Sequence, residues 1–256
     1  MRTLIYASCL LLLALLGVRS SHAKINGETR MGDGKSYWTL GLNAGFAWQD
    51  SDVRSRLGGG WGFYFGSSIY NKPNSFFSAD WRFRYMNTYT FGQNASDTRF
   101  GNAILADATR FGYDPSTSSF AHNHFTAFHD LSLEFRLNFE ALRRKTNIML
   151  SIYGGAGLGI YGTYFDQKDF SGADYNYDDQ LIDYSGTEQS IADDIISLRD
   201  EEYETPANMD PDGDREARLG IMPSVGFELG YWFSPHFALA VGHRTTFTLQ
   251  ENFDGV

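Results

Sequence analysis

The sequence predicts an all-β protein, an antiparallel up-and-down transmembrane β-barrel of about eight strands. Seven stretches alternate apolar with small or polar residues, and they are followed alternately by a long polar segment and by a turn of a few residues. A period of two is typical of strands with one apolar and one polar face. In hydrocarbon only helices and closed barrels pair every backbone N–H and C=O group. Because the stretches are rich in glycine and lack a continuous apolar run, strands between lipid and a polar lumen are predicted.

The first 23 residues have the composition of a secretory signal peptide. Arg2 is the charged start, residues 4–18 are apolar, and residues 21–23 form a small-x-small cleavage site. The apolar stretch is shorter than the roughly 20 residues that a membrane-spanning helix needs. We therefore predict cleavage after residue 23, which leaves a periplasmic N-terminal segment, 24–35, and an outer-membrane barrel domain, 36–256.

Each predicted strand has its own signature of alternation. The first has tryptophan near both ends of one face, as at membrane interfaces. The second and fifth place glycines on the inner face, the third and fourth place charges there, and the sixth and seventh combine small and charged inner residues. The seven predicted strands are 37–48, 57–70, 76–88, 125–140, 148–161, 221–233 and 237–249. A soluble β-sandwich also alternates, but its strands usually have about 5–6 residues.

The spacing between these strands predicts their orientation. Bacterial barrels keep short turns in the periplasm and long loops outside. Residues 49–56, 89–124 and 162–220 are therefore predicted surface loops. Seven strands cannot close a single-chain bacterial barrel, which needs an even number. We expect the eighth strand beyond Val256, with residues 100–111 as a weaker alternative.

The negative charge lies in one loop. The chain carries a formal charge of -10, yet residues 166–216 alone hold 17 acidic residues against three basic ones. No basic stripe remains, which excludes a nucleic-acid partner. Within this loop, residues 191–199 are predicted to form a short helix with Ser190 as its N-cap.

Four carboxylates of the acidic loop alternate around a glycine, as in calcium-binding loops. These candidate metal ligands are Asp210, Asp212, Asp214 and Glu216. The distal glutamate of the full twelve-residue calcium motif is absent, so a weak calcium site and a solvated, repulsive loop are both consistent with the sequence. No other cofactor is predicted.

Nine charged residues are predicted to face the lumen. They are Asp80, Arg82, Arg84, Asp130, Glu134, Arg136, Glu140, Glu228 and Arg244. An eight-stranded barrel is only wide enough for its own side chains, and an unpaired ion there is costly. The charges therefore form either a salt-bridged plug or a gated narrow pore whose pairs exchange partners.

No catalytic residue is predicted. His129, Ser132 and Glu134 share one strand, but alternation points His129 toward lipid and the other two inward, so they cannot act together. His122 and His124 are predicted on a surface loop, where two histidines are a weak metal signal. His243 is predicted to face lipid.

In strand layout and lumen charges, residues 36–250 resemble the OmpA-like group of small eight-stranded outer-membrane β-barrels, in particular the type common in Bacteroidota. The resemblance implies a Gram-negative cell envelope, with the protein spanning the outer membrane in contact with its lipid. A structural, anchoring or interaction role is expected, with a protein partner at the surface loops or the periplasmic side. The alternatives are a porin-like channel for ions or small solutes and a lipid-modifying outer-membrane enzyme.

Overall fold

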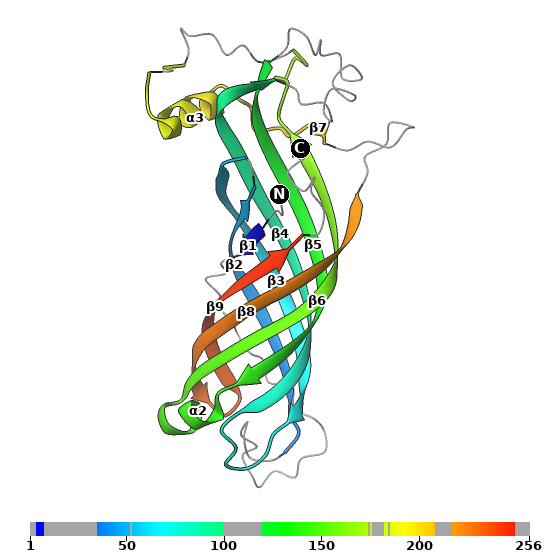
Figure 1. Ribbon diagram of the computed structural model, residues 1–256, viewed down its shortest axis with the longest axis vertical. Helices are drawn as coiled ribbons and strands as arrows, with labels where there is room; N and C mark the ends of the chain where they lie inside the picture. The colour runs from blue at the N-terminus through cyan, green and yellow to red at the C-terminus, as the bar shows by residue number, and fades with distance from the viewer. Residues whose placement is uncertain are drawn as a thin grey trace.

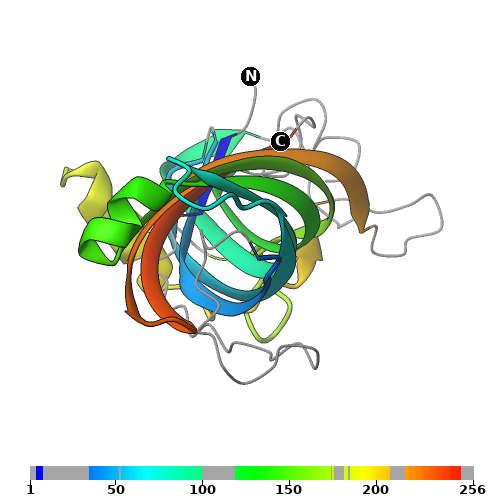
Figure 2. The same ribbon diagram turned by 90° about the horizontal axis from the view of Figure 1, so that it is seen from below.

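One antiparallel sheet of nine strands curls into a barrel (Figures 1 and 2). The structure is a computed structural model, and it describes residues 4–7, 35–51, 53–99, 119–173, 175, 182–183, 185–207 and 217–248. The predicted fold class is confirmed, because the long strands run up and down and pair with antiparallel neighbours.

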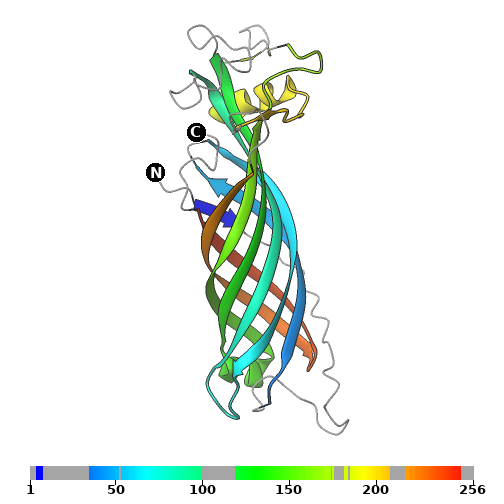
Figure 3. The same ribbon diagram turned by 90° about the vertical axis from the view of Figure 1, so that its right-hand side faces the viewer.

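The strands are β1 (Leu4–Ala7), β2 (Trp38–Asp50), β3 (Ser55–Tyr70), β4 (Ser78–Arg99), β5 (Ser119–Asn138), β6 (Ile148–Phe165), β7 (Thr205–Pro206), β8 (Arg218–Ser234) and β9 (Phe237–Phe247). The described helices are α2 (Glu140–Thr146) and α3 (Glu188–Ser197). Hydrogen-bonded neighbours follow the circuit β2, β3, β4, β5, β6, β8, β9, β1 and back to β2, with β7 added beside β6. Figure 3 shows the strong tilt of the strands and places α3 and α2 at opposite ends of the barrel.

The barrel has the reverse polarity of a soluble protein. Its outer face carries a belt of exposed apolar side chains, for example Leu42, Leu131 and Leu158 at 50–55% exposure. Its inner face buries arginine and glutamate, including Arg82 and Glu134. Both distributions follow from the period-two alternation, since successive side chains of a strand point to opposite faces.

β1 joins the two edges of the sheet over a short length. It pairs with β2 from Leu4↔Asp50 to Tyr6↔Trp48, and with β9 from Leu4↔Phe247 to Ala7↔Arg244. The four residues of β1 lie inside the segment predicted to be a signal peptide and occupy the position of the eighth strand. Both the leader and a strand beyond Val256 stay predictions, and the segment 24–34 lies outside the described residues.

The strands at the α3 end run farther than the sequence indicates. β4 continues to Arg99 and β5 begins at Ser119, so both extend into the predicted loop 89–124. Polar residues there suggested a loop, but the two strands pair with each other from Ser78↔Asn138 to Arg99↔Ser119, with one irregularity between Gln93 and Asp97.

The predicted short helix exists with shifted bounds. α3 covers Glu188–Ser197, and its N-cap is Thr187, whose hydroxyl accepts a hydrogen bond from the Ser190 amide at 3.2 Å. Ser190 was the wrong cap because the helix begins one turn earlier. Ile195 of α3 is fully buried against Ala121 at the start of β5. This contact ties part of the acidic loop to the barrel.

Neither described helix is long and apolar enough to span a membrane.

Candidate functional site: a charged lumen and a groove at the α3 end

Eight of the nine predicted lumen charges form one buried network. They are four arginines and four carboxylates, none more than 3% exposed: Asp80, Arg82, Arg84, Asp130, Glu134, Arg136, Glu228 and Arg244. β4, β5, β8 and β9 supply them. Their formal charges cancel, which is the condition for keeping so many ions out of water.

Glu228 is the centre of this network. Its carboxylate accepts hydrogen bonds from Arg82 Nη1 at 2.7 Å, from Arg84 Nη2 at 3.1 Å and from Arg136 Nη1 at 3.3 Å. Arg136 also donates from Nε to Asp80 Oδ1 at 2.9 Å. One carboxylate on β8 is therefore held by three guanidinium groups from β4 and β5.

Glu134 extends the network toward the α3 end. It accepts from Arg82 Nε and from Arg84 Nε, the latter at 3.1 Å, and Arg244 Nε lies 3.3 Å from its Oε1. Arg244 Nη2 in turn donates to Asp130. Charges of alternating sign therefore run without a break from Asp80 to Asp130.

Two tyrosines flank the central arginines. The guanidinium carbon of Arg82 lies 4.2 Å from the ring centre of Tyr153 and 5.1 Å from that of Tyr64. The corresponding distances for Arg84 are 5.2 and 5.5 Å. Cation–π contact in a desolvated site adds to the ion pairs. The alternation predicts that both rings face inward, but it does not predict their contact with the arginines. The one sequence signal for the position of the Tyr64 ring is Gly41, which pairs with Tyr64 and where a side chain would overlap that ring.

The ninth predicted charge, Glu140, is buried but lies outside the strand. β5 ends at Asn138, and Glu140 begins α2, whereas the predicted strand ran to residue 140 and only a short turn was expected before the next strand. It is 2.7 Å from Arg143 Nη2, one helical turn later, and accepts from Ser78 Oγ at 2.8 Å. The turn prediction was wrong because the i, i+3 pair stabilises a helix.

The histidines do not assemble a catalytic or metal site in the described residues. His129 lies outside the barrel, where its Nδ1 is 2.9 Å from the Tyr85 hydroxyl, whereas Ser132 and Glu134 are buried inside. His122 and His124 lie in β5 and are buried, so their assignment to a surface loop was wrong. Among the described residues no group of three His, Cys, Asp or Glu side chains could hold a metal ion.

His243 lies on the outer face, packed between Trp48 and Phe227 at ring distances of 6.2 and 6.1 Å. The predicted calcium ligands Asp210, Asp212, Asp214 and Glu216 lie outside the described residues, so the calcium site stays a prediction.

The described part of the acidic loop is fastened to the barrel by Arg199. Its Nη1 donates to Gln93 Oε1 and its Nη2 to the Ala121 carbonyl, each at 2.6 Å. Nearby, Asn123 Oδ1 accepts from the Asp166 amide at 3.0 Å. These contacts fix both ends of the segment between β6 and β7.

Asp166, just beyond β6, gives this attachment a pH dependence. Burial raises the pKa of its carboxyl group from 3.8 to about 6. Because the pKa of Asp166 is higher in the folded state than in the unfolded state, its protonated form stabilises the folded attachment. This stabilisation is complete below pH 3.8 and is lost as the pH rises through about 6. We expect the segment 167–207 to be cleaved faster by an added protease at pH 7.5 than at pH 5.

The Asp166→Asn variant removes this titration. Its ratio of cleavage rates at pH 7.5 and pH 5 should be close to the ratio that the same protease shows on a short peptide substrate. An unchanged ratio in the variant would assign the pH dependence to another group.

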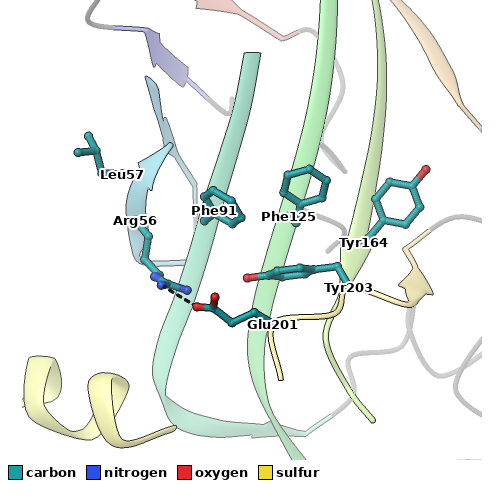
Figure 4. Close-up of a pocket in the computed structure, with 7 residues that line it drawn as sticks. All are labelled: Arg56, Leu57, Phe91, Phe125, Tyr164, Glu201 and Tyr203. Carbon is teal, nitrogen blue, oxygen red and sulfur yellow. Dashed lines mark ion pairs between the residues drawn. The ribbon is translucent and has the colours of Figure 1, made fainter. Parts of the chain in front are cut away.

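A groove of about 670 Å³ opens on the outer face at the α3 end (Figure 4). Its wall is one cross-strand row, in which Arg56 pairs with Phe91, Phe91 with Phe125, and Phe125 with Tyr164. Tyr203, from the loop before β7, lies over Phe91 and Phe125 at ring distances of 5.9 and 5.5 Å. This groove was not predictable from the sequence, because its residues become neighbours only through strand register and loop folding.

No protein-family model matches this chain, and no curated protein matches it. The geometry defines its class as an all-β, up-and-down antiparallel barrel with a polar interior and an apolar exterior.

Proposed function

We propose that this protein is an outer-membrane β-barrel that acts as a structural anchor and displays an acidic surface loop for interaction. The observation that supports the proposal most strongly is the reversed polarity of the barrel. A belt of half-exposed leucine, isoleucine and phenylalanine surrounds buried, charge-balanced arginines and carboxylates. Lipid stabilises such an exterior, and water does not.

The ion-pair network supports a closed barrel over a channel. The side chains of Arg82, Arg84 and Arg136 extend through the lumen to reach Glu228 on β8, a strand that is not adjacent to β4 or β5. A conducting path would have to break several of these buried pairs together, and each break leaves uncompensated charge.

Fractionation of a Gram-negative host that expresses the full chain tests the membrane proposal. We expect the protein in the outer-membrane fraction, with faster gel migration before heating than after. Protease added to intact cells should cleave between residues 166 and 216. Recovery in the soluble fraction, or migration that is independent of heating, would contradict the proposal.

Arg244→Ala separates the structural role from the porin-like alternative. We expect the variant barrel to lose about 3 kcal/mol or more of unfolding free energy, because Asp130 and Glu134 lose a buried partner. Planar bilayers should still show no steady conductance, since the other charged side chains fill the lumen. Arg144→Ala, an exposed arginine at the α2 end, is the control. Stable openings with Arg244→Ala alone would favour the channel.

A further inference from the structure

We propose that the groove at the α3 end binds the zwitterionic headgroup of a bilayer lipid, with the phosphate on Arg56 and the ammonium on Glu201 and the aromatic rings. The inference rests on the proposed membrane location and adds a ligand class to it.

The groove has the composition of a small-ligand site. Aromatic and aliphatic side chains form most of its surface, and one cation and one anion supply polar contacts: Arg56, Leu57, Phe91, Phe125, Tyr164, Glu201 and Tyr203 line it. Its volume, about 670 Å³, lies within the range of roughly 300–1,000 Å³ typical of ligand pockets. It is therefore large enough for a headgroup and the first part of its glycerol.

The two charges form a pair that a ligand can open at little cost. Arg56 Nη2 lies 3.7 Å from Glu201 Oε1, and the side chains are 34% and 64% exposed. Exposed pairs of this kind contribute about 0–1 kcal/mol. A molecule that carries both a phosphate and an ammonium replaces this one loose pair by two matched pairs. A singly charged headgroup would leave either Arg56 or Glu201 without its counter-ion.

The aromatic rings favour the ammonium end. Arg56 places its guanidinium carbon 5.9 Å from the centre of the Phe91 ring, so that ring already faces a cation. Tyr203 and Tyr164 complete a set of rings around Phe125, at centroid distances of 5.5 and 6.3 Å. Such clusters recognise ammonium groups by cation–π attraction.

The backbone at Glu201 is held in an unfavourable conformation. Its φ is 61°, in the left-handed region that a glutamate seldom adopts. The Glu202 amide donates to Asp200 Oδ1 at 2.9 Å and helps to hold this turn. The turn directs the carboxylate toward Arg56 (Figure 4), as expected where a strained residue presents a ligand-binding group.

The position of the groove beside the apolar belt favours a lipid over other zwitterionic molecules. Leu57, which lines the groove, is 63% exposed and belongs to the same outer face as Trp61 and Phe63 of the apolar belt. A headgroup in the groove can therefore keep its acyl chains against the belt. A soluble zwitterion without acyl chains gains no such contact.

Lipid capture from nanodiscs tests the proposal. The protein is inserted into discs of equal phosphatidylethanolamine and phosphatidylglycerol, extracted gently, and its retained lipids are counted by mass spectrometry. We expect phosphatidylethanolamine to be retained roughly fivefold over phosphatidylglycerol. Glu201→Gln should reduce this ratio to about one, and Arg56→Gln should lower retention of both lipids. Glu188→Gln, an exposed acid on α3, is the matched control.

Heat-dependent gel mobility of every sample shows whether the protein has inserted, and so separates failure of the headgroup site from failure of the membrane proposal. Inserted protein that retains both lipids equally, or an unchanged ratio in Glu201→Gln, overturns the headgroup site alone. Competition by soluble phosphoethanolamine as strong as by the lipid would assign the site to a free ligand. Failure of all variants to insert overturns the membrane proposal and the headgroup site together.

Discussion

Replacing Glu228 by glutamine should lower the free energy of unfolding of the barrel by about 3–5 kcal/mol, the typical cost of removing one partner from a buried ion pair. The amide keeps the size of the side chain but not its charge. Arg82, Arg84 and Arg136 would then share Asp80 and Glu134, and the buried network would carry an excess positive charge. Urea titration of the protein in lipid vesicles, followed by gel mobility, measures the change.

A second substitution provides the control for this result. Arg84→Gln in the Glu228→Gln background restores charge balance. The double variant should lose less unfolding free energy than the sum of the losses of the two single variants, because removing the positive charge of Arg84 offsets removing the negative charge of Glu228. Additive losses would mean that Glu228 acts by packing, and the electrostatic explanation of the lumen would be wrong.

A large effect of a different kind, steric and not electrostatic, is expected at Gly155 on β6. Gly155 pairs with Glu134, and a methyl group added to it would overlap the backbone carbonyl oxygen of Leu133. Backbone cannot move aside as a flexible side chain can, so Gly155→Ala should destabilise the barrel by about 1–3 kcal/mol. It should also reduce the yield of heat-modifiable protein after refolding.

Gly154→Ala is the matched control on the adjacent residue. There the added methyl group would lie 3.6 Å from its nearest neighbour, the Ser224 carbonyl oxygen, which is ordinary contact. The control should refold like the natural protein. Equal losses in both variants would indicate that β6 requires glycine for its backbone freedom and not for the close approach of β5.

The sequence predicted the fold because alternation alone determines which face of a strand each side chain occupies. Arg82 and Arg84, two residues apart, had to share one face, and so did Asp130 and Glu134. Alternation says nothing about which strand lies across the lumen, so the position of Glu228 at the centre of three arginines was not predictable.

Strand ends and loop contacts were harder to predict for a different reason. Gln93 lies in a polar stretch that suggested a loop, yet its side-chain oxygen Oε1 accepts a hydrogen bond from Arg199 of the acidic loop, more than a hundred residues later in the chain. Tyr203 gains its ring partners in the same way. Long-range partners override local propensity at these positions.

The lumen network also constrains the order in which this chain can fold. Arg82 and Glu228 are 146 residues apart, and Arg244 and Asp130 are 114 apart. Contacts of such long range form late, since the entropy of closing the intervening chain opposes them. A hairpin of β4 and β5 alone would hold Arg82, Arg84 and Arg136 without Glu228, and Asp130 without Arg244. In the proposed membrane location, we therefore expect the barrel to enter the bilayer in one concerted step, after β8 and β9 have brought their charges to the other strands.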